Sequence, residues 1–344
     1  MKAMVLNGKN KPFELQNVAD PTPGPGEAVV RNLACGSGLT IQHVRAGRVK
    51  VDYPRIIGHE IAGEIVAVGE GVTNLAVDDA VTAYFYLTCG HCKWCLSNRE
   101  TLCENFGGYV GRAVDGAYAE YMKLPAQNFI KLPEELDYKS HPAEVGVICD
   151  AITTPLKVTK RARIAPSDTV AVFGAGGGLG IHMLMLAQWA HARVIAVDIA
   201  DDKFEACRKA GADEVVNASD GTAVEQLLEL TDGKGIDVAI DFVSSTQTLE
   251  ESFNALGYGG RMVTLGGGGK GQFQADGGPM LDKELELLGS RYATKQEVID
   301  ALNLVARGQV WPLVTETVPL EEAETIHDRV EKGLVTGRAA VLIN

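Results

Sequence analysis

A glycine cluster between two apolar segments constrains the fold of this chain more than any other feature. The stretch "TVAVFGAGGGLGIHMLMLAQWA", residues 169 to 190, passes from a short apolar run through the glycines into a segment with helical periodicity. This order predicts a strand, a tight turn and a helix, as in a dinucleotide-binding turn. The glycines fit GxxGxxG and not the strict GxGxxG pattern, because Leu179 occupies the third glycine position counted from Gly174. The candidate cofactor-binding residues of the turn are Gly174, Gly176, Gly177, Gly178, Leu179 and Gly180.

A second predicted strand, "ARVIAVD", ends in an acidic residue, Asp198. It follows the turn at about the distance where a carboxylate meets the adenosine ribose hydroxyls of a dinucleotide. Asp198 would repel a 2′-phosphate, and Ile199 and Ala200 follow it in place of an arginine. The sequence therefore favours NAD over NADP. In the alternative interpretation, Asp198 only ends a strand.

Further apolar runs extend this pattern into an α/β fold. The runs "DVAIDFV" and "RMVTLGG" are separated by helical patterns, which predicts a doubly wound parallel sheet. The glycine-rich segment 266–278 predicts a mobile loop. The chain has 344 residues, which exceeds the usual size of a single hydrophobic core, so we expect two domains.

Four of the seven cysteines lie within the stretch "CGHCKWCLSNRETLC". Cys89, Cys92, Cys95 and Cys103 have a spacing that lets four thiolates surround one tetrahedral zinc ion. Because all four positions are cysteine, no coordination position stays open for water or substrate, which is typical of structural zinc. The alternative is four free surface thiols.

The charge and the apolar pattern exclude some partners. A net charge of −13 disfavours binding to nucleic acid or to an anionic membrane, since both require clustered lysine and arginine. The first residues, "MKAMVLNGKNKPFELQ", alternate like a strand and lack the apolar core of a signal peptide, and no apolar run approaches membrane-spanning length. We therefore expect a cytoplasmic protein.

The four-cysteine segment ahead of the glycine turn, together with "GHEIAGEIVAVGEGV" at residues 58–72, resembles the medium-chain, zinc-containing alcohol dehydrogenase family over essentially the whole chain. The resemblance implies a GroES-like, β-rich catalytic domain and a Rossmann domain that binds NAD(H). We expect the catalytic domain at 1–149, with a zinc lobe at 85–105, the Rossmann domain at 150–290, and a return to the catalytic domain at 291–344. An alcohol or carbonyl substrate and a homodimer or homotetramer are also expected.

The chain departs from the family pattern at one metal site. Where members carry a stretch like A-C-G-x-C-G-T-D-x-H, this chain reads "ACGSGLTIQH", so Gly38 replaces the zinc-binding cysteine and Ile41 replaces the aspartate that supports the zinc-binding histidine. Other family positions are kept, and the resemblance assigns their roles. They are His59 and Glu60, the proton-relay residues Thr40 and His43, the third ligand Asp150 (or Cys149 after a one-residue shift), the ribose-contacting Lys203 and the pyrophosphate-binding Arg338.

These departures leave several interpretations open. Zinc could still bind through His59, Asp150 and Glu60, with water in place of the thiolate. In the interpretation that we favour, the pocket holds no metal, Thr40 hydrogen-bonds the substrate oxygen and His43 relays its proton. A third interpretation is metal-independent reduction of an activated C=C bond. The last is a catalytically silent protein that binds NAD.

Overall fold

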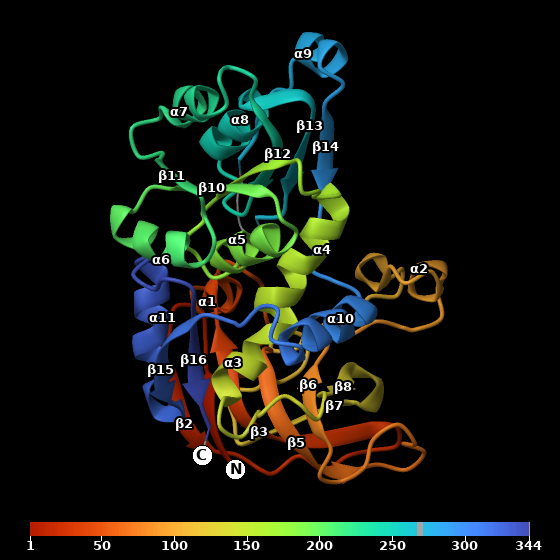
Figure 1. Ribbon diagram of the computed structural model, residues 1–344. Coiled ribbons are helices and arrows are strands. Elements are labelled where there is room, and N and C mark those ends of the chain that lie inside the picture. The colour runs from red at the N-terminus through yellow and green to blue at the C-terminus, as the bar shows by residue number, and fades with distance from the viewer. Residues whose placement is uncertain (267–270, 344) are drawn as a thin grey trace. The chain divides into compact units, whose positions relative to one another are not determined.

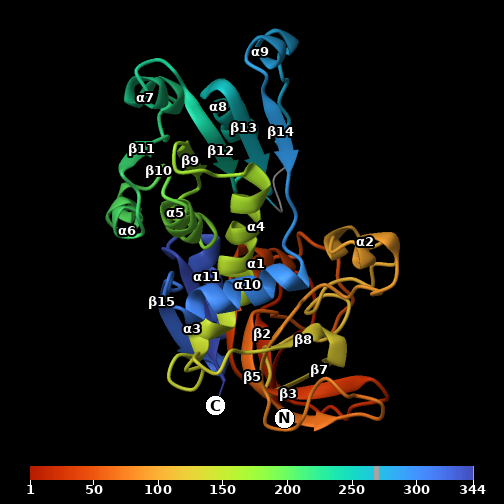
Figure 2. The same ribbon diagram turned by 45° about the vertical axis from the view of Figure 1, so that its right-hand side comes forward.

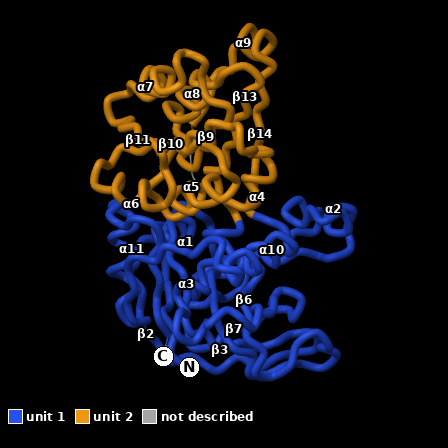
Figure 3. Tube along the Cα trace, in the orientation of Figure 1, with its two compact units in different colours: residues 1–153, 293–344 blue, residues 154–292 orange. Residues whose placement is uncertain are grey.

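The computed structural model describes residues 1–266 and 271–343, and the chain divides into two compact units (Figure 3). Unit 1 combines residues 1–153 with residues 293–344, and unit 2 comprises residues 154–292. Both ends of the chain thus belong to one unit, while the middle of the chain forms the other. No helix in the described ranges is both long and apolar enough to cross a lipid bilayer.

Unit 1 is built mainly from antiparallel strands. In the described part of the chain its larger sheet has seven strands in the order β15-β16-β3-β5-β6-β8, with β7 paired to β3, and β15 runs parallel to β16. These strands are β3 (Glu27–Ser37), β5 (Ile61–Val68), β6 (Ala80–Ala83), β7 (Tyr121–Pro125), β8 (Phe129–Lys131), β15 (Val314–Pro319) and β16 (Arg338–Leu342). A smaller sheet, in the order β2-β1-β4, contains β1 (Lys2–Leu6), β2 (Phe13–Asn17) and β4 (Arg55–Ile56).

The long strand β3 is the centre of the larger sheet. It pairs with β5, β7 and β16, and its sequence is apolar on both faces, as expected for a strand that is covered on both sides. Figure 1 shows β16, the last strand of the chain, in dark blue beside the red β3. The helical segments of unit 1 are α1 (Leu39–Arg45), α2 (Lys93–Leu96), η1 (Glu100–Leu102), η2 (Ala126–Asn128), α3 (Pro142–Val147), η3 (Ile148–Ile152), α10 (Lys295–Ala306), η5 (Leu320–Glu322) and α11 (Ala323–Glu331).

Unit 2 contains a parallel sheet in the order β11-β10-β9-β12-β13-β14. Its strands are β9 (Thr169–Phe173), β10 (Arg193–Asp198), β11 (Glu214–Asn217), β12 (Ile236–Asp241), β13 (Leu256–Thr264) and β14 (Glu286–Gly289). The central strands are almost entirely apolar because helices cover both faces. The strand order reverses between β9 and β12, which is the arrangement of a Rossmann fold. The predicted doubly wound parallel sheet is therefore confirmed.

The helices of unit 2 form two groups. Helices α5 and α6 pack together beside β9, β10 and β11, while α7 and α8 pack together on the other side of the strands (Figure 2). The helical segments are α4 (Thr153–Ala162), which begins at the last residue of unit 1, α5 (Gly180–Trp189), η4 (Asp201–Lys203), α6 (Phe204–Lys209), α7 (Ala223–Leu230), α8 (Thr246–Asn254) and α9 (Gly277–Asp282).

The glycine-rich segment 266–278 was predicted to be a mobile loop. Residues 267–270 of this segment lie outside the described residues. Of the remainder, residues 271–276 form neither helix nor strand, and α9 begins at Gly277.

Candidate active site

Three strand ends of unit 1 meet at one edge of the larger sheet. Ser37, the last residue of β3, lies opposite Ala339 of β16, so Arg338 comes beside Gly38. Because β5 also runs antiparallel to β3, the segment just before β5, which contains Glu60, reaches the same edge. Sheet pairing alone therefore assembles residues from distant parts of the sequence.

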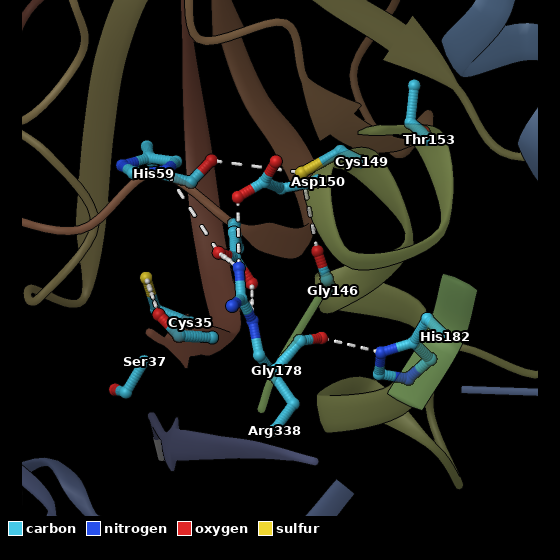
Figure 4. Close-up of polar contacts among 12 residues, drawn as sticks. Cys35, Ser37, His59, Gly146, Cys149, Asp150, Thr153, Gly178, His182 and Arg338 are labelled. Carbon is cyan, nitrogen blue, oxygen red and sulfur yellow. Dashed lines mark hydrogen bonds and ion pairs between the residues drawn. The ribbon is translucent and has the colours of Figure 1, made fainter. Parts of the chain in front are cut away.

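A buried cluster of His59, Glu60 and Asp150 lies at this edge, with one ligand-type atom from each residue within 4.8 Å of the others. Asp150 lies in η3, a single π-helical turn, a type of irregularity that is frequent at functional sites. Cys149 turns its Sγ toward the carbonyl oxygens of Gly146 and His59, at 3.4 and 3.9 Å (Figure 4). The structure thus brings Asp150, and not Cys149, to the cluster.

The side chain of Arg338 extends into the same cluster (Figure 4). Its Nε donates a hydrogen bond of 3.0 Å to Oε2 of Glu60, and its Nη2 donates both to Oε1 of Glu60 and, at 2.9 Å, to Oδ2 of Asp150. All three side chains are buried. The resemblance assigned Arg338 to a pyrophosphate, whereas here its guanidinium holds two carboxylates. No motif in the sequence indicates this contact.

Burial dominates the electrostatics of the cluster. It raises the pKa of Glu60 to about 7, against the opposing effect of the Arg338 charge. It lowers the pKa of His59 to about 3, so the imidazole is neutral at physiological pH. The His59 ring packs against Phe85, with 4.1 Å between ring centroids, and neither ring nitrogen has a hydrogen-bond partner among the described residues.

The catalytic zinc that the resemblance implies does not fit this arrangement. Both carboxylates of the cluster already accept hydrogen bonds from Arg338, and Gly38 supplies no thiolate. The Oδ1 atom of Asp150 takes no part in these contacts with Arg338, so His59 and Asp150 would be left as ligands, whereas catalytic zinc usually has three protein ligands. The buried Ile41 also provides no oxygen to orient the histidine ring, and such support commonly contributes tenfold or more to metal affinity.

The proposed relay residues Thr40 and His43 lie one turn apart on α1, and hence on one face of that helix. Nδ1 of His43 lies 2.9 Å from a guanidinium nitrogen of Arg48. Burial and then the Arg48 charge lower the pKa of His43. Among the residues that the structure describes, no direct polar contact joins Thr40 or His43 to the His59 cluster.

A further cation, Arg112, was missed by the sequence analysis. Its guanidinium stacks on the ring of Tyr109, 4.7 Å from the centroid. Its charge helps to lower the pKa values of both His43 and His59, which places it within electrostatic reach of both parts of the site. Arg112 belongs to no motif, so the sequence contained no signal for it.

The four cysteine sulfurs form a second, separate cluster in unit 1. The Sγ–Sγ distances are 3.5 Å for Cys92 to Cys95 and for Cys103 to Cys89, 3.9 Å for Cys89 to Cys95 and 4.0 Å for Cys92 to Cys103. Sulfurs placed tetrahedrally at about 2.3 Å from zinc stand about 3.8 Å apart. The amide of Asn105 also donates to Sγ of Cys89, at 3.7 Å. The residues present therefore fit a closed zinc site.

The glycine turn of unit 2 depends on residues without side chains. Gly174 adopts a positive φ of 75° directly after β9. A Cβ atom on Gly180 would lie 2.7 Å from Cα of Ala175 and would also meet the carbonyl oxygen of Gly174. Only glycine at position 180 therefore lets the start of α5 approach the end of β9 this closely.

The carboxylate of Asp198 accepts three backbone hydrogen bonds at the end of β10. Its Oδ2 accepts from Gly176 at 2.8 Å, and its Oδ1 accepts from Ile199 and Ala200 at 2.8 and 3.2 Å. The aliphatic part of Lys203 packs against Gly176, where a Cβ atom would lie 2.5 Å from the lysine Cδ. One acceptor position of Oδ2 stays available for a ribose hydroxyl.

This geometry predicts that Asp198→Ala narrows the preference for NAD over NADP, because it removes the carboxylate that repels a 2′-phosphate. The expected change is about tenfold or more in the ratio of the two dissociation constants, measured by cofactor fluorescence. Asp202→Ala, which removes an exposed carboxylate of η4, is the matched control and should leave the ratio unchanged. A wild-type protein that prefers NADP would refute the assignment of Asp198.

Models of known protein families match segments of both units. A model described as "Alcohol dehydrogenase GroES-like domain" matches residues 24–134, and one described as "Zinc-binding dehydrogenase" matches residues 178–307. An alcohol dehydrogenase of Geobacillus stearothermophilus is 36% identical, and the alignment covers 98% of each chain. An acryloyl-coenzyme A reductase of Metallosphaera sedula is 32% identical over 94% of each chain.

Solved structures show the same similarity over the full length. A crystal structure of an NAD-dependent alcohol dehydrogenase superposes with a TM-score of 0.91 at 30% sequence identity. The alignment covers 100% of both chains. The similarity therefore includes both units and the C-terminal return to unit 1.

Proposed function

Because the chain belongs to the zinc-containing alcohol dehydrogenase family of medium-chain dehydrogenases/reductases, we propose that it interconverts an alcohol and its ketone or aldehyde with NAD(H). The observation that carries this proposal is the glycine turn together with Asp198, the last residue of β10. The Asp198 carboxylate accepts a hydrogen bond from the turn and keeps one acceptor position for a ribose hydroxyl. The relatives described as NAD-dependent alcohol dehydrogenases support the same cofactor and reaction.

The residues of each unit have separate tasks in this mechanism. When bound, NAD(H) supplies or accepts the hydride. Thr40 donates a hydrogen bond to the substrate oxygen, and His43 receives the alcohol proton during oxidation and returns it during reduction. The lowered pKa of His43 keeps its imidazole neutral, and therefore able to accept a proton, at neutral pH. We propose that zinc has only a structural role, at one ion per chain in the four-cysteine lobe.

A second candidate reaction is the reduction of a C=C bond conjugated to a carbonyl. The 32% identity to an acryloyl-coenzyme A reductase favours it. In that reaction the hydride forms a new C–H bond at the β-carbon, the C=C bond electrons form an enolate, and a proton then adds at the α-carbon. The enolate oxygen requires stabilisation by hydrogen bonds, which a site without a catalytic metal can provide.

Product analysis separates these reactions. The wild-type protein is incubated with NADH and a panel of ketones, aldehydes and α,β-unsaturated carbonyl compounds, and the products are identified by mass spectrometry and NMR. An alcohol product supports the proposal, whereas a saturated carbonyl product supports the second candidate. Binding of NADH without turnover of any compound in the panel would contradict both and would favour a silent NAD-binding protein.

The role of His43 predicts a specific pH dependence. Burial lowers the pKa of His43, the charges of Arg48 and Arg112 lower it further, and Glu331 raises it. Arg48→Gln removes one positive charge, so the pKa of His43 should rise. The acid limb of the pH–rate profile for alcohol oxidation should then move to higher pH. Lys50→Gln, which removes an exposed charge two residues away, is the control and should not move the limb. An unchanged acid limb in Arg48→Gln, or full oxidation by His43→Ala near neutral pH, would exclude His43 as the proton acceptor.

A further inference from the structure

The guanidinium of Arg338 keeps two donors that its carboxylate partners do not use. Arginine has five N–H groups, of which one is on Nε and two are on each terminal nitrogen. The three hydrogen bonds to Glu60 and Asp150 use Nε and both hydrogens of Nη2. Nη1 has no hydrogen-bond partner among the described residues. The two carboxylates fix the orientation of the planar guanidinium, and Nη1 lies on the side of the group that they do not contact.

Glycines at positions 38 and 36 let the side chains of Arg338 and Glu60 lie where they do. A Cβ atom on Gly38 would meet Nη1 and would lie 2.7 Å from the guanidinium carbon of Arg338. A Cβ atom on Gly36 would meet Glu60, and it would lie 2.7 Å from a methyl group of Val147. The guanidinium therefore occupies the space that a cysteine at position 38 would require.

A second polar group of the cluster is also without a partner. Nε2 of His59 is buried, has no hydrogen-bond partner among the described residues, and lies 4.0 Å from Oε1 of Glu60. Buried polar atoms are usually hydrogen-bonded, so one without a partner requires an explanation, such as a bound water, an ion or a catalytic role. His59, from the segment before β5, thus lies with Arg338 of β16 around Glu60.

We propose that Arg338 replaces the family's catalytic cation and hydrogen-bonds the substrate carbonyl oxygen through Nη1. This inference rests on the proposed oxidoreductase function. Glu60 and Asp150 position the guanidinium, and Gly38 makes room for it. As hydride arrives at the carbonyl carbon, the C=O π electrons move to the oxygen, and a fixed guanidinium stabilises the resulting negative charge without reorganisation. The proton relay then converts the alkoxide to the alcohol.

The kinetic test uses Arg338→Gln and Arg338→Lys in the full-length protein with NADH and the best carbonyl substrate of the wild type. Loss of one oxyanion donor typically lowers kcat by about 100-fold or more, and this is the result expected for Arg338→Gln. The dissociation constant of NADH should stay within about twofold of the wild-type value. Arg338→Lys keeps the positive charge that Glu60 and Asp150 require, so it tests the same loss of kcat if the glutamine variant does not fold. Arg307→Gln, which removes an exposed charge after α10, is the matched control.

The two roles considered for Arg338 give opposite kinetic results. A raised dissociation constant for NADH with kcat retained at saturating cofactor would assign Arg338 to the pyrophosphate and overturn the inference. Wild-type kcat in both Arg338 variants would overturn it as well. A wild type that turns over no carbonyl compound would instead contradict the proposed function.

The zinc content of Gly38→Cys tests the placement of Arg338 independently of turnover. We expect this variant to retain the wild-type zinc count, because Arg338 occupies the space of the new side chain. Gly277→Cys, at an exposed position where a Cβ atom meets no other atom, controls for zinc captured by any added thiol. One additional zinc per chain in Gly38→Cys, but not in the control, would show that the guanidinium does not hold this position.

Discussion

Cys95→Ser is expected to release the structural zinc and to unfold the lobe at residues 85–105. Cys95 lies in α2, and its sulfur stands 3.5 and 3.9 Å from those of Cys92 and Cys89. Binding of zinc to a closed four-cysteine site contributes directly to folding, and loss of a structural metal commonly destabilises a protein by about 4 kcal/mol or more. Zinc per chain by elemental analysis, the melting temperature and limited proteolysis within the lobe are the measurements.

The control for this experiment is Cys207→Ala. Cys207 is a buried thiol of unit 2 that belongs to neither of the ligand clusters found in the described residues. It should keep the wild-type zinc content. If Cys95→Ser keeps its zinc and its melting temperature, the four cysteines are not a zinc site.

Gly180→Ala is expected to have the second largest effect. The added methyl group would collide with the backbone of Gly174 and Ala175, and neither contact can be relieved by rotation of a side chain. We expect a loss of stability of about 3 kcal/mol and an NADH dissociation constant at least about tenfold higher, because α5 must move away from β9. Thermal unfolding and NADH fluorescence titration measure the two effects.

Gly277→Ala supplies the comparison, since a methyl group at the start of α9 meets no other atom. Its stability should stay close to the wild-type value, or rise slightly, because alanine favours helices by up to about 1 kcal/mol. Wild-type cofactor affinity in Gly180→Ala would contradict the role that we give to the close approach of strand and helix.

The sequence was most informative where the determining interactions are local. The glycine turn, the strand that ends at Asp198 and the four-cysteine segment each lie within a few tens of residues, and their spacing reflects backbone conformation or ligand geometry. The parallel sheet followed from the same reasoning, because buried parallel strands are continuous apolar runs. These features could be predicted without knowledge of tertiary contacts.

The contacts of Arg338 could not be predicted in the same way. Arg338 reaches Glu60 only because β16 pairs with β3 and β3 pairs with β5, and these pairings join segments far apart in the sequence. Whether Cys149 or Asp150 reaches the His59 cluster depends on η3, where one π-helical turn changes the direction of each side chain. Neither effect leaves a periodic pattern in the sequence.

The zinc content of the active wild-type enzyme tests the central claim most directly. The purified protein is dialysed against a chelator, its zinc is counted per chain, and NADH-dependent carbonyl reduction is measured on the same sample. Our account predicts one zinc per chain, held by the four cysteines, together with full turnover. Two zinc ions per chain in the active enzyme, or turnover that is lost on chelation and restored by Zn²⁺ while the four-cysteine site remains filled, would contradict it.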